Sequence, residues 1–220
     1  MDMKEKLKNF VPRRVFIQLL ILLLGQLLSY YGAKEIIENL PHMYIGQPID
    51  ELIPLIPCTI IIYYGCFLFW AYNYAVILRN EPEGTYRFFS AELLGKLICF
   101  ICYVAFPTVM ARPEITGSGI FSRIIAMMYS IDAPDALLPS MHCFVSWMCV
   151  IGLRGKPEIT RRHRILSVIA AVLVFIATLT TKQHVIIDVI TGIILAELVY
   201  FVTGLFCNKV PAPNTSDMEL

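Results

Sequence analysis

Two histidines occur in settings where an imidazole ring can do chemistry, and the first of them is His184. Asp188 follows His184 by four residues, a spacing that places both side chains on one face of a helix. A carboxylate beside an imidazole fixes the tautomer of the ring and raises its basicity, as it does for nucleophiles and for general bases. A structural hydrogen bond would use the same spacing, so the chemical interpretation needs support from other residues.

The second histidine, His142, ends the segment Pro139-Ser140-Met141-His142, and an apolar run follows at once. Proline suits the first turn of a helix. Ser140 and His142 are therefore predicted to lie where free backbone N–H groups meet the positive end of a helix dipole, an arrangement that binds anions. The alternative is an ordinary helix start with a histidine at the membrane interface.

Two basic residues lie close to these histidines in the sequence or in the predicted topology. Arg112, followed by Pro113, comes after the third apolar run, and Lys182 lies two residues before His184. Basic groups, a helix N-terminus and two histidines together indicate phosphate chemistry. Metal binding is the weaker alternative, because the sequence contains no compact ligand motif, and we predict no metal site.

The elements that position these residues are predicted to be membrane helices. Of the 220 residues, 57% are hydrophobic and 16% are charged, whereas soluble domains carry about 25% charged residues. This composition excludes an ordinary soluble fold and a disordered chain. The net charge of +1 leaves no basic surface that would indicate a nucleic-acid partner.

Six apolar runs approach the roughly 17–25 residues that a membrane-spanning helix needs. They predict an all-α, polytopic integral membrane protein with six transmembrane helices in a single domain, residues 15–206. A basic N-terminal segment, 1–14, precedes this domain and a tail, 207–220, follows it. The runs cover residues 15–33, 53–78, 93–110, 136–153, 165–181 and 183–206.

The distribution of lysine and arginine predicts the orientation of these helices. Five basic residues precede the first run, two lie between the second and third, five lie between the fourth and fifth, and one follows the last. The opposite side carries only Lys34, Arg112, Arg123 and Lys182. Because basic residues accumulate in cytoplasmic loops, we predict cytoplasmic termini and a site on the extracytoplasmic face, with the plasma membrane as the expected location.

Two further expectations concern segments away from the histidines. The outer segments 34–52 and 111–135 could form interfacial helices or simply lie on the membrane surface. Lys96 in the third run and Glu197 in the sixth are ionisable groups in apolar sequence, and such groups rarely face lipid without a partner. We therefore expect Lys96 and Glu197 to form an ion pair that fastens the third helix to the sixth.

The chemistry-bearing segments together resemble a known family. In order and spacing they are similar to the three signatures of the type 2 phosphatidic acid phosphatase superfamily, and the resemblance covers the chain from the third run onward. It implies a six-helix membrane enzyme that acts on lipid phosphates without a metal ion or another cofactor. The segments are Arg112-Pro113, Pro139-Ser140-Met141-His142 and His184-Val185-Ile186-Ile187-Asp188.

The resemblance also implies a role for each matched residue. His184 would be the nucleophile that forms a phosphohistidine, and Asp188 would orient its ring. His142 would protonate the leaving group. Arg112 and Ser140, with backbone N–H groups, would hold the phosphoryl oxygens.

Two signature positions differ from the family pattern. Ala105 stands where the first signature has a lysine, and Ala177 and Thr178 stand where the third has Ser-Arg. Lys182 could supply the missing charge and is our remaining candidate for binding phosphate. In lacking Ser-Arg, the chain is more similar to the sphingomyelin synthase and inositol phosphorylceramide synthase branch, whose His-x-x-x-Asp-Val pattern recurs here from His184.

Three functions are consistent with this sequence. The first is a phosphatase that hydrolyses a phosphomonoester or pyrophosphate lipid in the membrane. The second is a phosphotransferase that moves a phospho-head group to a lipid alcohol such as ceramide or diacylglycerol, by the same chemistry. The third is a transporter or scaffold without activity, although a scaffold has no need of His142 or His184. The expected partners are the lipid substrate and membrane lipids, and no oligomeric state is predicted.

A substitution of Lys182 tests whether it replaces the missing arginine. If its ammonium group holds the phosphate, Lys182→Ala should raise KM for a lipid phosphate far more than threefold. A change below about threefold, roughly 0.65 kcal/mol, would instead indicate a lysine that only extends from the interface to water.

Overall fold

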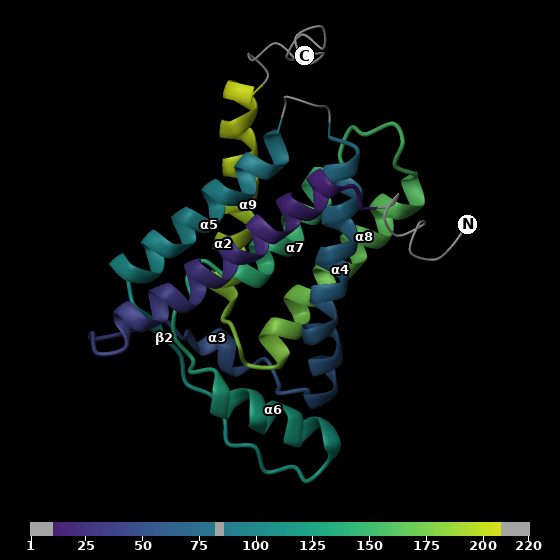
Figure 1. Cartoon of the computed structure of the whole chain (residues 1–220). Coiled ribbons are helices and arrows are strands. Elements are labelled where there is room, and N and C mark those ends of the chain that lie inside the picture. Colours follow the sequence, from purple (N-terminus) through teal and green to yellow (C-terminus); the bar gives the residue numbers. More distant parts are fainter. Residues whose placement is uncertain (1–10, 82–85, 208–220) are drawn as a thin grey trace, which may run out of the picture.

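The computed structural model describes residues 11–81 and 86–207 and is largely helical (Figure 1). The predicted N-terminal segment 1–14 is therefore described only from residue 11, and the predicted tail only at Cys207; the rest of both lies outside the described residues. Within the two described ranges, five helices are long and apolar enough to cross a membrane. They are α2 (Arg13–Ile37), α4 (Ile60–Arg79, continuous with the 3-10 turn η1, Pro57–Thr59), α5 (Arg87–Ala105), α8 (Arg161–Thr180) and α9 (Ile186–Cys207).

The predicted fourth span, residues 136–153, forms a shorter helix. This helix, α7 (Met141–Gly152), has 12 residues, fewer than the roughly 17–25 that a membrane-spanning helix needs. The helical fold and five of the six long apolar segments agree with the prediction. Six spans and cytoplasmic termini stay predictions.

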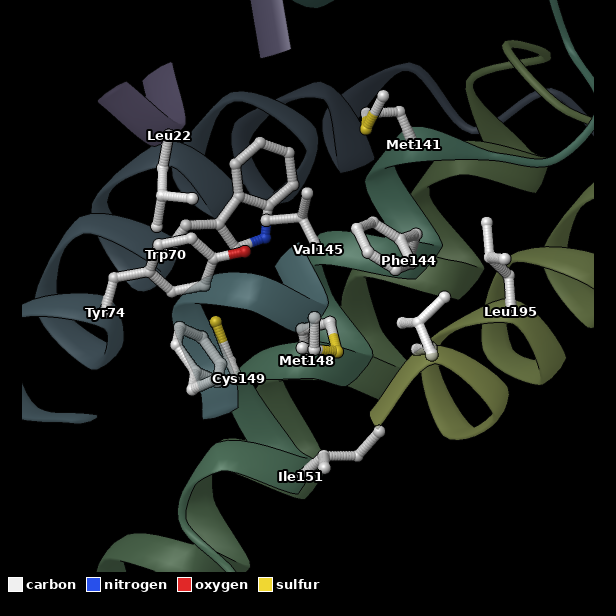
Figure 2. Packing of buried hydrophobic residues seen from close by; sticks show 14 of the residues in the cluster. Leu22, Trp70, Tyr74, Met141, Phe144, Val145, Met148, Cys149, Ile151 and Leu195 are labelled. Carbon is white, nitrogen blue, oxygen red and sulfur yellow. The ribbon is translucent and has the colours of Figure 1, made fainter. Parts of the chain in front are cut away.

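Helix α7 lies at the centre of the molecule, where it contacts α4, α5, α8 and α9. Its apolar side chains are buried except for the partly buried Trp147, whereas the five long helices expose large apolar side chains along part of their surface. Figure 2 shows Phe144 and Met148 of α7 packed among side chains of the neighbouring helices, including Trp70 of α4 and Leu195 of α9. A helix that is apolar all round is typical of a buried position.

The segments that join α2 to α4 and α5 to α7, together with the turn between α8 and α9, lie at the end of the molecule opposite the end of α9 (Figure 1). Helix α6 (Ile120–Ile131) lies within the second predicted outer segment, as its amphipathic pattern indicated. The segment 34–52 instead contains the end of α2, the strand β1 (Met43–Tyr44) and the short helix α3 (Pro48–Glu51). β1 pairs in parallel with β2 (Thr108–Val109).

The predicted ion pair between Lys96 and Glu197 is wrong. The Lys96 Nζ atom lies 3.0 Å from Glu92 Oε2, one turn away on α5, and also donates to the Leu22 carbonyl of α2 at 3.0 Å. Glu197 accepts hydrogen bonds from Arg154 and from Trp147 Nε1, with distances of 2.7 to 2.9 Å. Lys96 therefore pairs with Glu92, and Glu197 pairs with Arg154.

The contact between Glu92 and Lys96 should dominate the stability of this region, because the two side chains are only 0% and 2% exposed. Lys96→Met leaves a buried carboxylate without its cation and should lower the free energy of unfolding by about 3–5 kcal/mol. The double variant Lys96→Met/Glu92→Gln should lose less than this single variant. Denaturation in mixed micelles measures the losses, and simple additivity of the two single changes would contradict the pairing.

Candidate functional site

The predicted pair of His184 and Asp188 is present at the start of α9. His184 Nδ1 lies 3.1 Å from Asp188 Oδ2, and the same oxygen accepts the Val185 backbone N–H at 3.1 Å. Asp188 is fully buried. Because a carboxylate can only accept, Nδ1 carries the proton of a neutral ring. The Nε2 atom therefore keeps its lone pair for another reaction partner.

The turn between α8 and α9 holds the backbone of His184. The backbone N–H groups of Gln183 and His184 both donate to the Thr178 carbonyl, at 3.0 and 3.2 Å. The buried Thr178 hydroxyl donates to Phe175 O at 2.8 Å. Thr178, at the signature position of the missing arginine, thus anchors the turn that carries His184 but supplies no charge.

Ser140 and His142 lie at the start of α7, as predicted. Ser140 is the N-cap, and its Oγ accepts the Cys143 N–H at 3.3 Å. Ser140 is fully buried and lines neither of the two cavities described below, so its role in binding phosphate stays a prediction. The ring centroid of His142 lies 5.7 Å from that of His184 and 4.6 Å from that of Tyr63. The fold therefore brings together the two histidines that lie 42 residues apart in the sequence.

Arg112 follows β2 and binds the segment directly before His184. Its guanidinium donates to Lys182 O at 3.3 Å, to Gln183 Oε1 at 2.9 Å and to the Asp132 carbonyl. Burial lowers the pKa of Arg112, an effect that the Asp132 carboxylate opposes. A guanidinium has five N–H donors, so these three hydrogen bonds leave donors free for an anion.

Two cavities meet at His184 and Arg112, which line both. The aromatic cavity, of about 230 Å³, is also lined by His142 and by residues of α2, α4, α5 and α6. The loop cavity, of about 440 Å³, lies against segments 44–55 and 110–113. Aromatic side chains line the first of these cavities, among them Tyr30, Tyr31, Tyr63, Tyr64, Phe67 and Tyr103.

Lys182 lines the loop cavity, where its Nζ donates to the Asp50 carbonyl at 2.8 Å. It is absent from the lining of the aromatic cavity, which contains both histidines. Lys182 therefore lies beside the site, with a protein carbonyl as its partner. Its role in binding phosphate stays a prediction.

Sequence reasoning missed the residues that enclose the aromatic cavity. Asp132 accepts hydrogen bonds from Tyr30 and Lys34, each at 2.7 Å, and Lys34 also lies 2.7 Å from Asp135. Tyr103 donates to the Pro139 carbonyl at 2.6 Å, directly before Ser140. In the sequence, these residues were indicated only by the two carboxylates at the end of segment 111–135. The sequence did not show which side chains those carboxylates would contact.

A glycine allows the two histidine-bearing helices to approach closely. A Cβ atom at Gly192 of α9 would lie 2.7 Å from the Ser140 carbonyl and 3.1 Å from Cys143 Cβ. In the observed packing, Ser140 N donates to the Asp188 carbonyl at 3.1 Å. A larger residue at position 192 would therefore separate the start of α7 from the start of α9.

Comparison with known proteins gives one finding. A family model described as the PAP2 superfamily matches residues 54–202, which contain every predicted site residue. Neither a curated protein nor a solved structure matches the chain.

The close approach of α7 and α9 yields a prediction for Gly192→Ala. Overpacking a tight contact costs about 1–3 kcal/mol, so this change should lower the free energy of unfolding although alanine favours helix formation. Gly65→Ala on α4 is the matched control, since a Cβ atom there meets no atom within 4 Å. Thermal unfolding in detergent measures both. Equal transition temperatures for the two variants would show that Gly192 is not needed for packing.

Proposed function

The chain belongs to the PAP2 superfamily, and on this premise we propose that it is a membrane lipid phosphatase. It hydrolyses a phosphomonoester or pyrophosphate lipid through a phosphohistidine intermediate. The observation that carries the proposal is that His142, His184 and Arg112 line one cavity. Metal ions or other cofactors have no part in the proposed reaction.

In the first step, His184 Nε2 attacks the phosphorus atom and the bond from phosphorus to the leaving oxygen breaks. Asp188 supports this step because it holds Nδ1 at 3.1 Å and stabilises the positive charge that develops on the ring. A protonated His142 donates its proton to the leaving oxygen. The two rings lie edge to face with their centroids 5.7 Å apart, so the side chains must move apart to admit a phosphoryl group between them.

The phosphoryl oxygens are held by donors from two segments, that of Arg112 and the start of α7. The free N–H groups of Arg112 and the backbone at the start of α7 donate to the anion, and the Ser140 hydroxyl, fully buried in this structure, joins them once the phosphate is bound. Donors that are fixed in place before the reaction stabilise the charge of the transition state at little cost of rearrangement. In the second step a water molecule loses a proton to His142 and attacks the phosphohistidine, which releases phosphate and restores His184.

A phosphotransferase is the second candidate. Ala105 and Thr178 replace two cations of the family signatures, and this difference favours a substrate with fewer negative charges than a phosphomonoester carries. A lipid alcohol would then take the place of water in the second step. The paired histidines support either enzyme over a transporter or a scaffold.

The location of the reaction follows from the distribution of basic residues. We propose six membrane spans, with α7 as the fourth, cytoplasmic termini and a site at the extracytoplasmic face of the plasma membrane. The positive-inside rule supports this orientation. The apolar surfaces of the five long helices support insertion in a bilayer.

The proposal is tested with the purified protein in detergent, short-chain lipid phosphates and an excess of EDTA. We expect phosphate release that survives chelation. His184→Ala should lower the rate by several orders of magnitude, because the removal of one member of a group of residues that act together abolishes most of the rate enhancement of the whole group. Asp188→Asn should lower the rate less than His184→Ala, since it perturbs only the orientation of the His184 ring.

His42→Ala is the control, because His42 lines neither cavity. Wild-type rates for folded His184→Ala would refute the phosphohistidine mechanism. A panel of lipid alcohols, with products identified by mass spectrometry, distinguishes the two enzymes. Transfer to an alcohol without release of free phosphate would contradict the phosphatase proposal and support the phosphotransferase.

A further inference from the structure

We infer that Asp50 is a positioning residue for His184, although it lies 134 residues earlier in the sequence. The inference rests on the proposed function in one respect, namely that His184 is the group that reacts. Asp50 belongs to segment 43–59, which we call the brace. The brace contains β1, α3 and η1.

Asp50 binds the chain on both sides of His184. Its Oδ1 accepts the Ile186 backbone N–H at 2.8 Å, and its carbonyl accepts the Lys182 ammonium group at 2.8 Å. Its other carboxylate oxygen, Oδ2, accepts the Gln47 N–H at 2.9 Å. The side chain is almost fully buried, at 8% exposure. Asp50 thus fixes the residues two before and two after His184.

The chemistry of a helix start explains why a carboxylate occupies this position. The first N–H groups of a helix have no partner within the helix, and the helix dipole places positive charge there. At the start of α9, Asp188 satisfies the N–H of Val185 and Asp50 satisfies that of Ile186. Without Asp50, the first turn of α9 would lose a partner directly beside the pair of His184 and Asp188.

The brace is itself fastened at two places, so Asp50 has a defined position. Met43 N donates to Pro107 O at 2.8 Å and Ile45 N to Val109 O at 3.1 Å, in the segment that leads to Arg112. At its other end, Ile56 N donates to Thr180 O at 2.9 Å, at the end of α8. The brace therefore connects the segment of Arg112 with the segment of His184, and Asp50 is its contact with the start of α9.

Asp50 acts through the backbone and not on a substrate. Both of its carboxylate oxygens accept protein N–H groups, and it lines the loop cavity but not the aromatic cavity that contains His142. Its loss should accordingly change the orientation of His184 while the lipid still binds. This predicts an effect on kcat with little effect on KM.

Three variants test the inference by activity. Asp50→Ala should lower kcat by about 10- to 100-fold, because a small misplacement of a reacting group can cost about a hundredfold, with KM within threefold. Asp50→Asn keeps an oxygen acceptor for Ile186 N–H and should recover kcat to within about fivefold of wild type. Glu51→Ala, which removes the exposed neighbouring carboxylate, should leave kcat unchanged. A normal kcat for Asp50→Ala, or equal losses in the alanine and asparagine variants, would overturn the inference.

Hydrogen exchange gives a second measurement that needs no activity. Exchange at the Ile186 amide should be at least tenfold faster in Asp50→Ala than in wild type, and close to wild type in Asp50→Asn and Glu51→Ala. Unchanged exchange in Asp50→Ala would overturn the inference. If wild type releases no phosphate while exchange behaves as expected, the proposed function fails and the positioning contact stands.

A further variant keeps the test decisive if Asp50→Ala does not fold. Asp50→Glu retains the charge but adds a methylene group, so the carboxylate can no longer hold Ile186 N–H and Gln47 N–H in the observed geometry. We expect a loss in kcat of at least fivefold with unchanged KM, together with faster exchange at Ile186. Wild-type values for both would overturn the inference.

Discussion

The contact between the start of α7 and the start of α9 is the constraint on which the site depends. There the Ser140 N–H binds the Asp188 carbonyl, and Gly192 offers no side chain that would prevent the approach. His142 belongs to one helix, and His184 lies two residues before the other. Their common cavity therefore exists only because two backbones meet at this point, and the aromatic side chains around it fill the space that the contact defines.

The local part of this arrangement could be predicted from the sequence, and the distant part could not. The spacing of four residues predicted the contact of His184 with Asp188, although His184 precedes the first helical residue, Ile186. Pro139 predicted the start of α7 to within two residues, although it lies before the N-cap Ser140 and not in the first turn. The position of Arg112 depends instead on the pairing of β1 with β2, two strands of two residues each. Such short strands leave no periodic pattern in a sequence, and the role of Asp50 depends on the same segment.

The incorrect ion pair has a related cause. Charged residues set the limits of an apolar run, so the predicted third span began after Glu92, whereas α5 begins at Arg87. Inside the bundle, however, the Glu92 carboxylate is completely buried, because it forms an ion pair with Lys96 and accepts a hydrogen bond from the Tyr74 hydroxyl. A hydropathy pattern records the cost of a charge but not the partner that offsets it. The prediction therefore assigned Lys96 to a carboxylate on another helix.

The position of the aromatic cavity determines which substrate concentration limits the rate of the proposed reaction, the one in the membrane or the one in the bulk solution. Its lining includes Tyr31 of α2 and Tyr64 and Phe67 of α4, which are 62%, 45% and 48% exposed on the apolar flank of the bundle. A lipid could approach the histidines along this flank while its acyl chains stay in the bilayer. The enzyme would then respond to the mole fraction of its substrate among the surrounding lipids, and dilution of the membrane by other lipids would slow it even at a constant bulk concentration.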